Sequence, residues 1–217
     1  MHVLIINGSP RVKKFSNTDK ILDKFCEGLS EKGNSYLRYE ISDRRQWETI
    51  RQAWDESNNI LIALPLYVEC IPGLLLEFLE TVTPHKDDAD ISFILQSGFA
   101  EGCQLRCGEE YLKLMSKHLG CRYKGTLVKG DNFSIRFFED EKRDRITTPY
   151  KRMGQIYGEE ASFDSEECKA FTGPEVFPAY VRVLVGLMFK TVARKSFEKI
   201  SKEWGCTKPL DYRPYGT

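Results

Sequence analysis

The chain has 217 residues, which is long enough for one α/β domain to bury a core of its own. Hydrophobic residues make up 41% and charged residues 29%, a composition that is typical of globular proteins and excludes a largely disordered chain. Lys and Arg together number 32, as do Asp and Glu, so the formal net charge is zero. This balance argues against nucleic acid or an anionic membrane as the main partner, although it is compatible with a local charged patch.

The cysteines and the N-terminus indicate a reducing compartment. Seven cysteines without regular spacing do not form the pattern of a disulfide framework. Cys103 and Cys107 lie one helical turn apart with no ligand partner at metal-site spacing, so we expect two buried thiols and no metal. No charged segment followed by a long apolar run opens the chain. We therefore expect a cytoplasmic protein without a membrane partner.

The predicted elements alternate between strand and helix along the chain. Apolar runs and weaker alternating patterns predict five strands, at residues 2–7, 35–42, 59–67, 90–98 and 123–130. Helical spacing predicts four helices between and after them, over residues 18–32, 43–56, 73–82 and 101–120. This order predicts an α/β fold with a parallel sheet and helices on both faces.

The last part of the chain departs from this alternation. Residues 131–173 include the charge-dense run FFEDEKRDR, and we interpret them as an irregular insertion with room for one short helix. A long helix is expected over 174–204. Its apolar stripe should belong to the core, or in part to a dimer contact, and consists of Val181, Leu184, Val185, Met188 and Phe189. We thus expect a single domain over residues 1–217.

Three loops follow the carboxyl ends of predicted strands. They are NGSPRVKKFSNT after the first strand, PLYVECIPG after the third and QSGFAEG after the fourth. In open parallel sheets, ligands bind beyond these ends, where the strand order reverses. The three loops should therefore form one pocket.

The first loop has the chemistry of a phosphate site. It enters a helix at Asn17–Thr18, where free backbone N–H groups and the positive end of the helix dipole favour an anion. No Gly-Lys pair precedes this helix and no G-x-G-x-x-G is present, so neither common nucleotide loop applies. We predict a monophosphate cradle with side-chain donors from Ser9, Ser16, Asn17 and Thr18. The alternative is that Ser16, Asn17 and Thr18 only cap the helix.

The other two loops suit a flat ring. A flat apolar ring would fit against Pro65 and Leu66 and beneath Tyr67. The alternative is that the proline only ends a strand and the tyrosine only covers the core. The third loop offers backbone amides, a hydroxyl and a side-chain amide to the polar edge of such a ring. Its residues are Gln96, Ser97, Gly98 and Phe99.

Together, these motifs resemble the flavodoxin-like NAD(P)H-dependent flavin mononucleotide (FMN) reductases. INGSPR followed by SNT is similar to their phosphate loop, and PLYVECIPGLLLEFLE to their segment whose proline and aromatic residue contact the isoalloxazine. QSGFAEG resembles the third flavin loop of a subset of them. The resemblance covers about residues 1–130. It implies a flavodoxin-like three-layer sandwich with a five-stranded parallel sheet in the order 2-1-3-4-5, FMN as cofactor, and a cytoplasmic homodimer.

On this resemblance, the chain would pass a hydride from NADH or NADPH through flavin N5 to a quinone, nitro, azo or similar small-molecule acceptor. The flavin carries this chemistry, so no catalytic side chain and no metal ligand is predicted. The cofactor contacts that we predict are Ser9, Arg11, Ser16, Asn17, Thr18, Pro65, Leu66, Tyr67, Val68, Gln96, Ser97, Gly98 and Phe99. Two alternatives stay open. One is a flavodoxin-type electron carrier, against which the zero net charge argues, and the other is a flavin-free binding or regulatory module.

Overall fold

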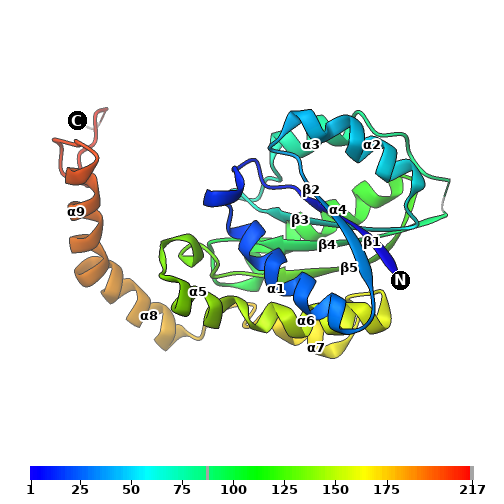
Figure 1. The fold of residues 1–217 in the computed structure, drawn as a ribbon. Helices are drawn as coiled ribbons and strands as arrows, with labels where there is room; N and C mark the ends of the chain where they lie inside the picture. Colours follow the sequence, from blue (N-terminus) through cyan, green and yellow to red (C-terminus); the bar gives the residue numbers. More distant parts are fainter. Residues whose placement is uncertain (87, 216–217) are drawn as a thin grey trace. The chain divides into compact units, whose positions relative to one another are not determined.

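The computed structural model, which describes residues 1–86 and 88–215, contains a five-stranded parallel sheet in the order β2-β1-β3-β4-β5 (Figure 1). The strands are β1 (His2–Asn7), β2 (Ser35–Glu40), β3 (Asn59–Pro65), β4 (Ala89–Gln96) and β5 (Cys121–Lys129). The predicted parallel sheet and its strand order are confirmed. Because β1 lies between β2 and β3, the strand order reverses between β1 and β3, where a ligand site is expected.

Helices cover both faces of the sheet and give the predicted three layers. Those packed on it are α1 (Asn17–Glu31), α2 (Trp47–Glu56), α3 (Gly73–Leu79), α4 (Arg106–His118) and α6 (Pro149–Glu160). Successive side chains of a strand point to opposite faces. Leu4 and Ile6 of β1 therefore pack with α2, α3 and α4, whereas Val3 and Ile5 pack with α1 and α6. Both sets of side chains are fully buried, which explains the continuous apolar run.

Short 3₁₀ turns precede three of these helices. They are η1 (Lys13–Phe15) before α1, η2 (Arg44–Gln46) before α2 and η3 (Gly102–Leu105) before α4. The predicted helix over 101–120 is thus a 3₁₀ turn followed by a shorter α-helix. Asp43 accepts a hydrogen bond from the backbone N–H of Arg45, so it caps the turn that leads into α2.

Residues 131–173 are more regular than the sequence analysis predicts. They contain η4 (Ile135–Phe137), α5 (Asp140–Thr147) and α7 (Glu166–Phe171) in addition to α6. Four side chains of α6 are buried against α1 and the sheet, namely Tyr150, Met153, Ile156 and Tyr157. Their spacing is helical, but charged and glycine residues between them obscure the pattern in the sequence. The segment interpreted as an insertion therefore supplies a helix of the core.

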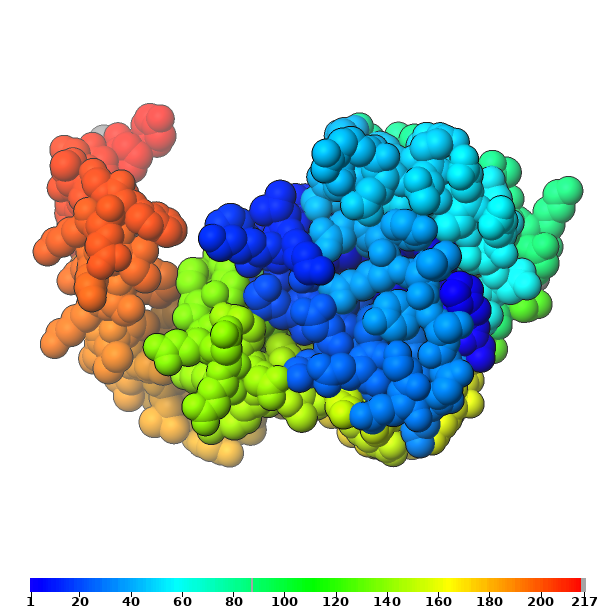
Figure 2. All heavy atoms as spheres, in the orientation of Figure 1, coloured from blue at the N-terminus to red at the C-terminus, as the bar shows by residue number. Residues whose placement is uncertain are grey.

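The backbones of α1 and α6 touch at two glycines. A Cβ atom added to Gly28 would lie 1.9 Å from the carbonyl oxygen of Lys151, and one added to Gly154 would lie 2.0 Å from that of Phe25. Only glycine allows so close an approach. Figure 2 shows the green atoms of α5 beside the blue atoms of α1, where Lys24 and Asp144 form an ion pair at 2.6 Å. The segment 140–160 thus covers one side of α1.

The chain divides into two compact units, Met1–Glu175 and Val176–Thr217. The second unit contains α8 (Ala179–Met188), a π-helical turn η5 (Phe189–Ala193) and α9 (Arg194–Glu203). The predicted helix over 174–204 therefore starts later and changes its helical type midway. No described residue of this unit is buried, so the assignment of the stripe at 181–189 to the core is wrong. The expected single domain and the dimer contact stay predictions.

All seven cysteines are free thiols. Cys103 and Cys107 are exposed, so the prediction that they are buried is wrong. The reason is that they lie in η3 and at the start of α4, on the side turned away from the sheet. None of the described helices is long and apolar enough to cross a membrane.

The glycine contact between α1 and α6 gives a first prediction. Gly28→Ala should lower the free energy of unfolding by about 3 kcal/mol, because the added methyl group forces two helix backbones apart. Gly73→Ala is the matched control, since a Cβ at Gly73 meets nothing within 4 Å, and should change stability by less than about 0.5 kcal/mol. Urea denaturation measures both. Equal stability of Gly28→Ala and wild type would contradict the close contact.

Candidate functional site

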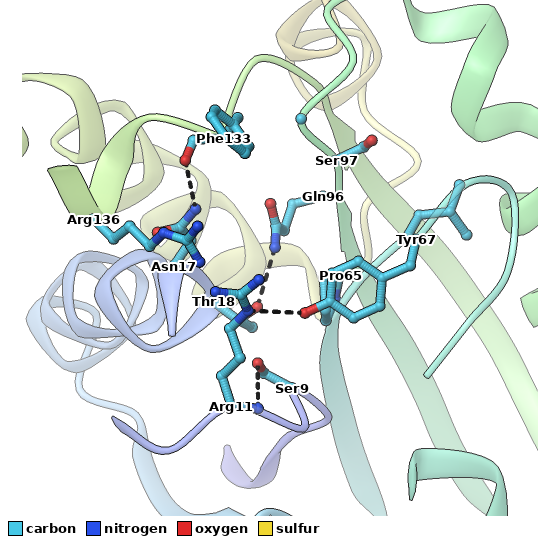
Figure 3. A pocket seen from close by; sticks show the side chains of 12 residues that line it. Ser9, Arg11, Asn17, Thr18, Pro65, Tyr67, Gln96, Ser97, Phe133 and Arg136 are labelled. Carbon is cyan, nitrogen blue, oxygen red and sulfur yellow. Dashed lines mark hydrogen bonds between the residues drawn. The ribbon is translucent and has the colours of Figure 1, made fainter. Parts of the chain in front are cut away.

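The carboxyl ends of β1, β3 and β4 open into one cavity of about 210 Å³ (Figure 3). Loops far apart in the sequence meet there, as the sequence analysis predicts. Ten of the thirteen predicted cofactor contacts line the cavity, namely Ser9, Arg11, Asn17, Thr18, Pro65, Leu66, Tyr67, Gln96, Ser97 and Gly98. The structure does not bring the other three, Ser16, Val68 and Phe99, into its lining.

Ser16 is engaged elsewhere. Its side-chain oxygen accepts a hydrogen bond from the backbone N–H of Asp19 at 3.1 Å, so it is the N-cap of α1. The side chain is fully buried behind the loop. Asn17 and Thr18, the next two residues, line the cavity instead. Of Ser16, Asn17 and Thr18, only Ser16 therefore caps the helix as the alternative interpretation predicts.

Val68 lies in a tight turn that keeps it out of the cavity. The backbones of Tyr67 and Cys70 exchange two hydrogen bonds, with N···O distances of 2.8 and 3.1 Å. Between them, Val68 and Glu69 have φ angles of 47° and 66°, which is the geometry of a type I′ turn. A β-branched residue with positive φ is unusual. The turn leaves the Val68 side chain largely exposed, while Tyr67 lines the cavity.

Three hydroxyl groups of the cavity are poised to donate hydrogen bonds. The hydroxyls of Ser9 and Ser97 each accept a bond from the backbone N–H two residues later, at 3.3 and 3.2 Å. The Thr18 hydroxyl accepts one from the side-chain amide of Gln96 at 3.2 Å (Figure 3). A hydroxyl that accepts a bond keeps its own proton for donation. All three residues are buried and line the cavity, so each hydroxyl is able to donate a bond to a ligand there.

The charges of the lining residues are all positive. Arg11 and Arg136 line the cavity, and no Asp or Glu is among its lining residues. The Arg11 Nε donates to the Tyr67 hydroxyl at 3.3 Å, which joins the first loop to the second. The guanidinium of Arg136 lies 4.5 Å from the centroid of the Phe137 ring. Together with the positive end of the α1 dipole, these groups favour an anion.

A fourth loop, after β5, also contributes to the cavity, although none of its residues is among the predicted cofactor contacts. Phe133 and Arg136 line it, and both belong to the segment interpreted as an insertion. A signal was present, because β5 ends at the same edge of the sheet as β4 and is followed by the polar run GDN. The rule that located the other three loops applies here as well.

Asn132 connects this fourth loop to its surroundings. Its backbone N–H donates to the carbonyl oxygen of Ser97 at 2.9 Å, and its side-chain amide donates to the Lys129 carbonyl at 3.0 Å and the Tyr150 hydroxyl at 2.9 Å. Its own carbonyl oxygen accepts a bond from the side chain of Asn17 at 2.7 Å. One buried residue thereby holds the β4 loop, the end of β5, α6 and the start of α1 in fixed positions.

A carboxyl group with an altered pKa lies beside the first loop. Glu40, the last residue of β2, pairs in register with Asn7 at the end of β1. Burial raises its pKa above the usual value near 4.5, and the negative charge of Asp19 adds to this effect. Asp19 is itself buried and forms an ion pair with Arg38. The positive charge of Lys13 lowers the pKa of Glu40 only in part.

Comparison with known proteins supports the fold. Neither a family model nor a curated protein matches the sequence. An FMN-dependent NADH-azoreductase from Bacillus anthracis in complex with FMN matches in structure, with a TM-score of 0.53 and 16% identity over 73% of this chain and 100% of that chain. An NADPH-quinone reductase from P. pentosaceus matches with a TM-score of 0.51 and 16% identity, over 71% of this chain and 98% of the other.

An oxidoreductase from Corynebacterium diphtheriae also matches, with a TM-score of 0.51 and 14% identity over 73% of this chain and 96% of that chain. The chain has a flavodoxin-like fold. Identities this low establish the flavodoxin-like fold and nothing about the reaction. The chemistry therefore has to be argued from the cavity of this chain.

The connections of Asn132 give a second prediction. Asn132→Ala should lower the free energy of unfolding by about 2 kcal/mol, because it leaves the buried Tyr150 hydroxyl without its donor and removes one of the two donors to the Lys129 carbonyl. Asn58→Ala is the control, since Asn58 is exposed, and should have almost no effect. Urea denaturation of both variants decides the matter. Similar stabilities for the two would show that Asn132 does not hold the loops.

The raised pKa of Glu40 gives a third prediction. A carboxyl group whose pKa is raised by folding stabilises the native state only while it is protonated, so ionised Glu40 destabilises the protein at neutral pH. Glu40→Gln should therefore have a higher Tm than wild type at pH 7. The difference should vanish as the pH falls below about 4.5, where Glu40 is protonated in both states. Thermal melting from pH 4 to pH 8 measures this, with the exposed Glu110→Gln as control. A difference that is constant with pH would contradict the assignment.

Proposed function

We propose that this chain is an FMN-dependent oxidoreductase that uses NADH or NADPH to reduce a small molecule such as a quinone or an azo compound. The observation that carries the proposal is the set of groups around the cavity. Three buried residues with hydroxyl groups, two arginines and the first residues of α1 line it, and no carboxylate is among the lining residues. An azoreductase in complex with FMN and an NADPH-quinone reductase share the flavodoxin-like fold, which supports the same conclusion.

The polar groups suit FMN in particular. A phosphate needs donors, and Ser9, Thr18 and the start of α1 supply them. The side-chain oxygen of Asn17 is buried and has no hydrogen-bond partner among the described residues, although the amide nitrogen of the same side chain donates to two carbonyl groups. This oxygen is therefore an acceptor, as the hydroxyls of a ribityl chain require. FMN is a ligand that combines a phosphate with such hydroxyls.

The apolar groups suit the flavin ring. Pro65, Leu66 and Tyr67 offer a surface for its flat face, and the Ser97 hydroxyl offers a donor for its polar edge. At about 210 Å³, the cavity is smaller than the roughly 300–1,000 Å³ of pockets that enclose a whole ligand. Part of a bound FMN would consequently stay accessible, as a flavin that exchanges electrons with two successive substrates requires.

Bound FMN supplies the redox chemistry, since its ring accepts and returns a hydride. The side chains of this protein bind and orient it. The Ser97 hydroxyl would stabilise negative charge on a reduced ring, and the bond from Arg11 to the Tyr67 hydroxyl would hold the Tyr67 ring at the edge of the cavity. No side chain has to act as nucleophile or general base. We also propose a homodimer in the cytoplasm, as the sequence resemblance implies.

A comparison of FMN with riboflavin tests the phosphate site. FMN should bind at least about tenfold more tightly than riboflavin, since hydrogen bonds to a charged group contribute about 1.5–3 kcal/mol each. Thr18→Val should remove most of this difference by weakening FMN alone. The control is Thr126→Val, a buried threonine outside the cavity whose hydroxyl pairs with that of Tyr123. Equal affinities of wild-type protein for the two flavins would refute the phosphate site.

Anaerobic addition of NADH or NADPH to the FMN-loaded protein then tests the reaction. The flavin absorption bands should bleach with one of the two donors and return when a quinone is added. Bands that persist with both donors would favour an electron carrier, for which the first unit has a suitable charge. Residues 1–175 contain 24 basic and 29 acidic residues, so their formal charge is −5. Protein that retains no FMN would favour a flavin-free binding module.

A further inference from the structure

The zero net charge of the chain conceals two opposite charges. Residues 176–217 contain eight of the 32 basic residues and only three of the 32 acidic ones, so this unit has a formal charge of +5. The acidic residues are confined to its second half. From Val176 to Phe197 the chain has four cations, Arg182, Lys190, Arg194 and Lys195, and no carboxylate. The second unit thus begins with a basic segment that includes α8, η5 and the start of α9.

The same segment carries large apolar side chains that the unit itself does not bury. In α8, Val183, Leu184, Leu187 and Met188 are all about half exposed or more. Val192 is 71% exposed and Trp204 80%. No described residue between 176 and 215 is buried. Because a helix of a folded core buries its apolar face, this one is built to meet something outside the unit.

The basic and apolar residues of α8 and the start of η5 occupy different sides of the helical segment. Arg182, Gly186 and Lys190 follow each other at intervals of four residues and therefore form one narrow polar stripe. The remaining circumference of α8 is apolar. The apolar surface beside this narrow polar stripe is wider than the surface that a single helical partner would cover.

The π-helical turn η5 aligns the apolar side of α9 with the apolar side of α8. In an unbroken α-helix, the apolar stripe of Phe197, Ile200 and Trp204 would continue the basic stripe of Arg182 and Lys190. The wider turn at Phe189–Ala193 holds about one extra residue and so rotates α9 by roughly 100°. The rotation returns the apolar stripe of α9 to the apolar side of α8. One amphipathic surface therefore extends over about 25 residues, or about 37 Å.

We propose that this amphipathic segment, residues 176–204, binds the surface of a bilayer that contains anionic phospholipids. Its apolar side would enter the boundary between headgroups and acyl chains, and Arg182, Lys190 and Lys195 would meet the phosphate groups, whereas Arg194 pairs with Glu198 and Asp211. Tyr180 and Trp204, at the two ends, are residues that prefer the membrane–water interface. The proposal does not depend on the reaction at the cavity.

Sedimentation with vesicles tests the proposal on the full-length protein. Wild-type protein should sediment with vesicles made of an equal mixture of phosphatidylcholine and phosphatidylserine. The amount that sediments with vesicles of phosphatidylcholine alone should be at least about tenfold smaller, because each cation near an anionic surface contributes about 1 kcal/mol to binding. Salt at about 1 M should release it, since the screening length then falls to about 3 Å.

Two variants and their controls identify the surface. Leu184→Glu, and Arg182→Glu together with Lys190→Glu, should each reduce binding to anionic vesicles about tenfold or more. The control variants Leu114→Glu and Lys113→Glu carry the same kinds of substitution at exposed positions of α4. They should bind anionic vesicles as tightly as wild-type protein does. Unchanged far-ultraviolet circular dichroism and thermal melting in each variant would show that the fold is intact, independently of any flavin.

Three outcomes would overturn the proposal. These are wild-type protein that stays in solution with both kinds of vesicle, equal sedimentation with both, and variants of α8 that sediment as wild type does. Light scattering adds a discriminating measurement. If Leu184→Glu converts a dimer to a monomer while wild type ignores vesicles, the apolar side belongs to a second copy of the chain.

Discussion

The arrangement of the cavity depends on the hydrogen bonds of one buried asparagine. Asn132 lies at the end of the sheet, where the loops after β4 and β5 meet the first turns of α1 and α6. A buried amide that lost these partners would be left unsatisfied, so each partner constrains the position of the others. This cost explains how loops can form a defined site although their own apolar contacts are few. The defined site in turn brings three residues with hydroxyl groups, Ser9, Thr18 and Ser97, to one cavity.

The packing of α1 on α6 also fixes the position of the site. The cavity uses the N-terminal end of α1, and the glycine contacts at Gly28 and Gly154 set how closely this helix approaches its neighbour. The side-chain amide of Asn34 strengthens the far end of the pair by donating to the carbonyls of Leu29 and Gly158. The helix that would bind a phosphate is therefore held at both of its ends. Its direction is set by packing rather than by the loop that precedes it.

Much of the fold could be predicted because the strands are buried on both faces. Runs such as HVLIIN leave little doubt about a central strand, and alternation with helices then dictates a parallel sheet. The three loops could be found for the same reason, since they follow the ends of those strands. Ser16 and Val68 do not line the cavity, because local backbone geometry decides their orientation. Ser16 caps a helix and Val68 lies in a type I′ turn, so both side chains point away from the cavity. The spacing of residues in the sequence reveals neither feature.

The C-terminal half was harder for a different reason. Charged residues on the exposed side of α6 hide the apolar positions that face α1, so a core helix was interpreted as an insertion. A π-helical turn has no residue signature, so α8 and α9 were predicted as one helix with its apolar stripe in the core. The net charge misled as well, because a sum over the whole chain cannot reveal two units of opposite sign.

The orientation of the Asn17 amide has a consequence for the lifetime of the protein. Its nitrogen is committed to two backbone carbonyls, so its oxygen is the atom left without a partner. Spontaneous deamidation would replace that nitrogen with a second oxygen and add a negative charge. The resulting carboxylate would repel both the carbonyls behind it and any anion at the start of α1. A carboxylate at this single position would therefore weaken the binding that we propose for a phosphate at the start of α1.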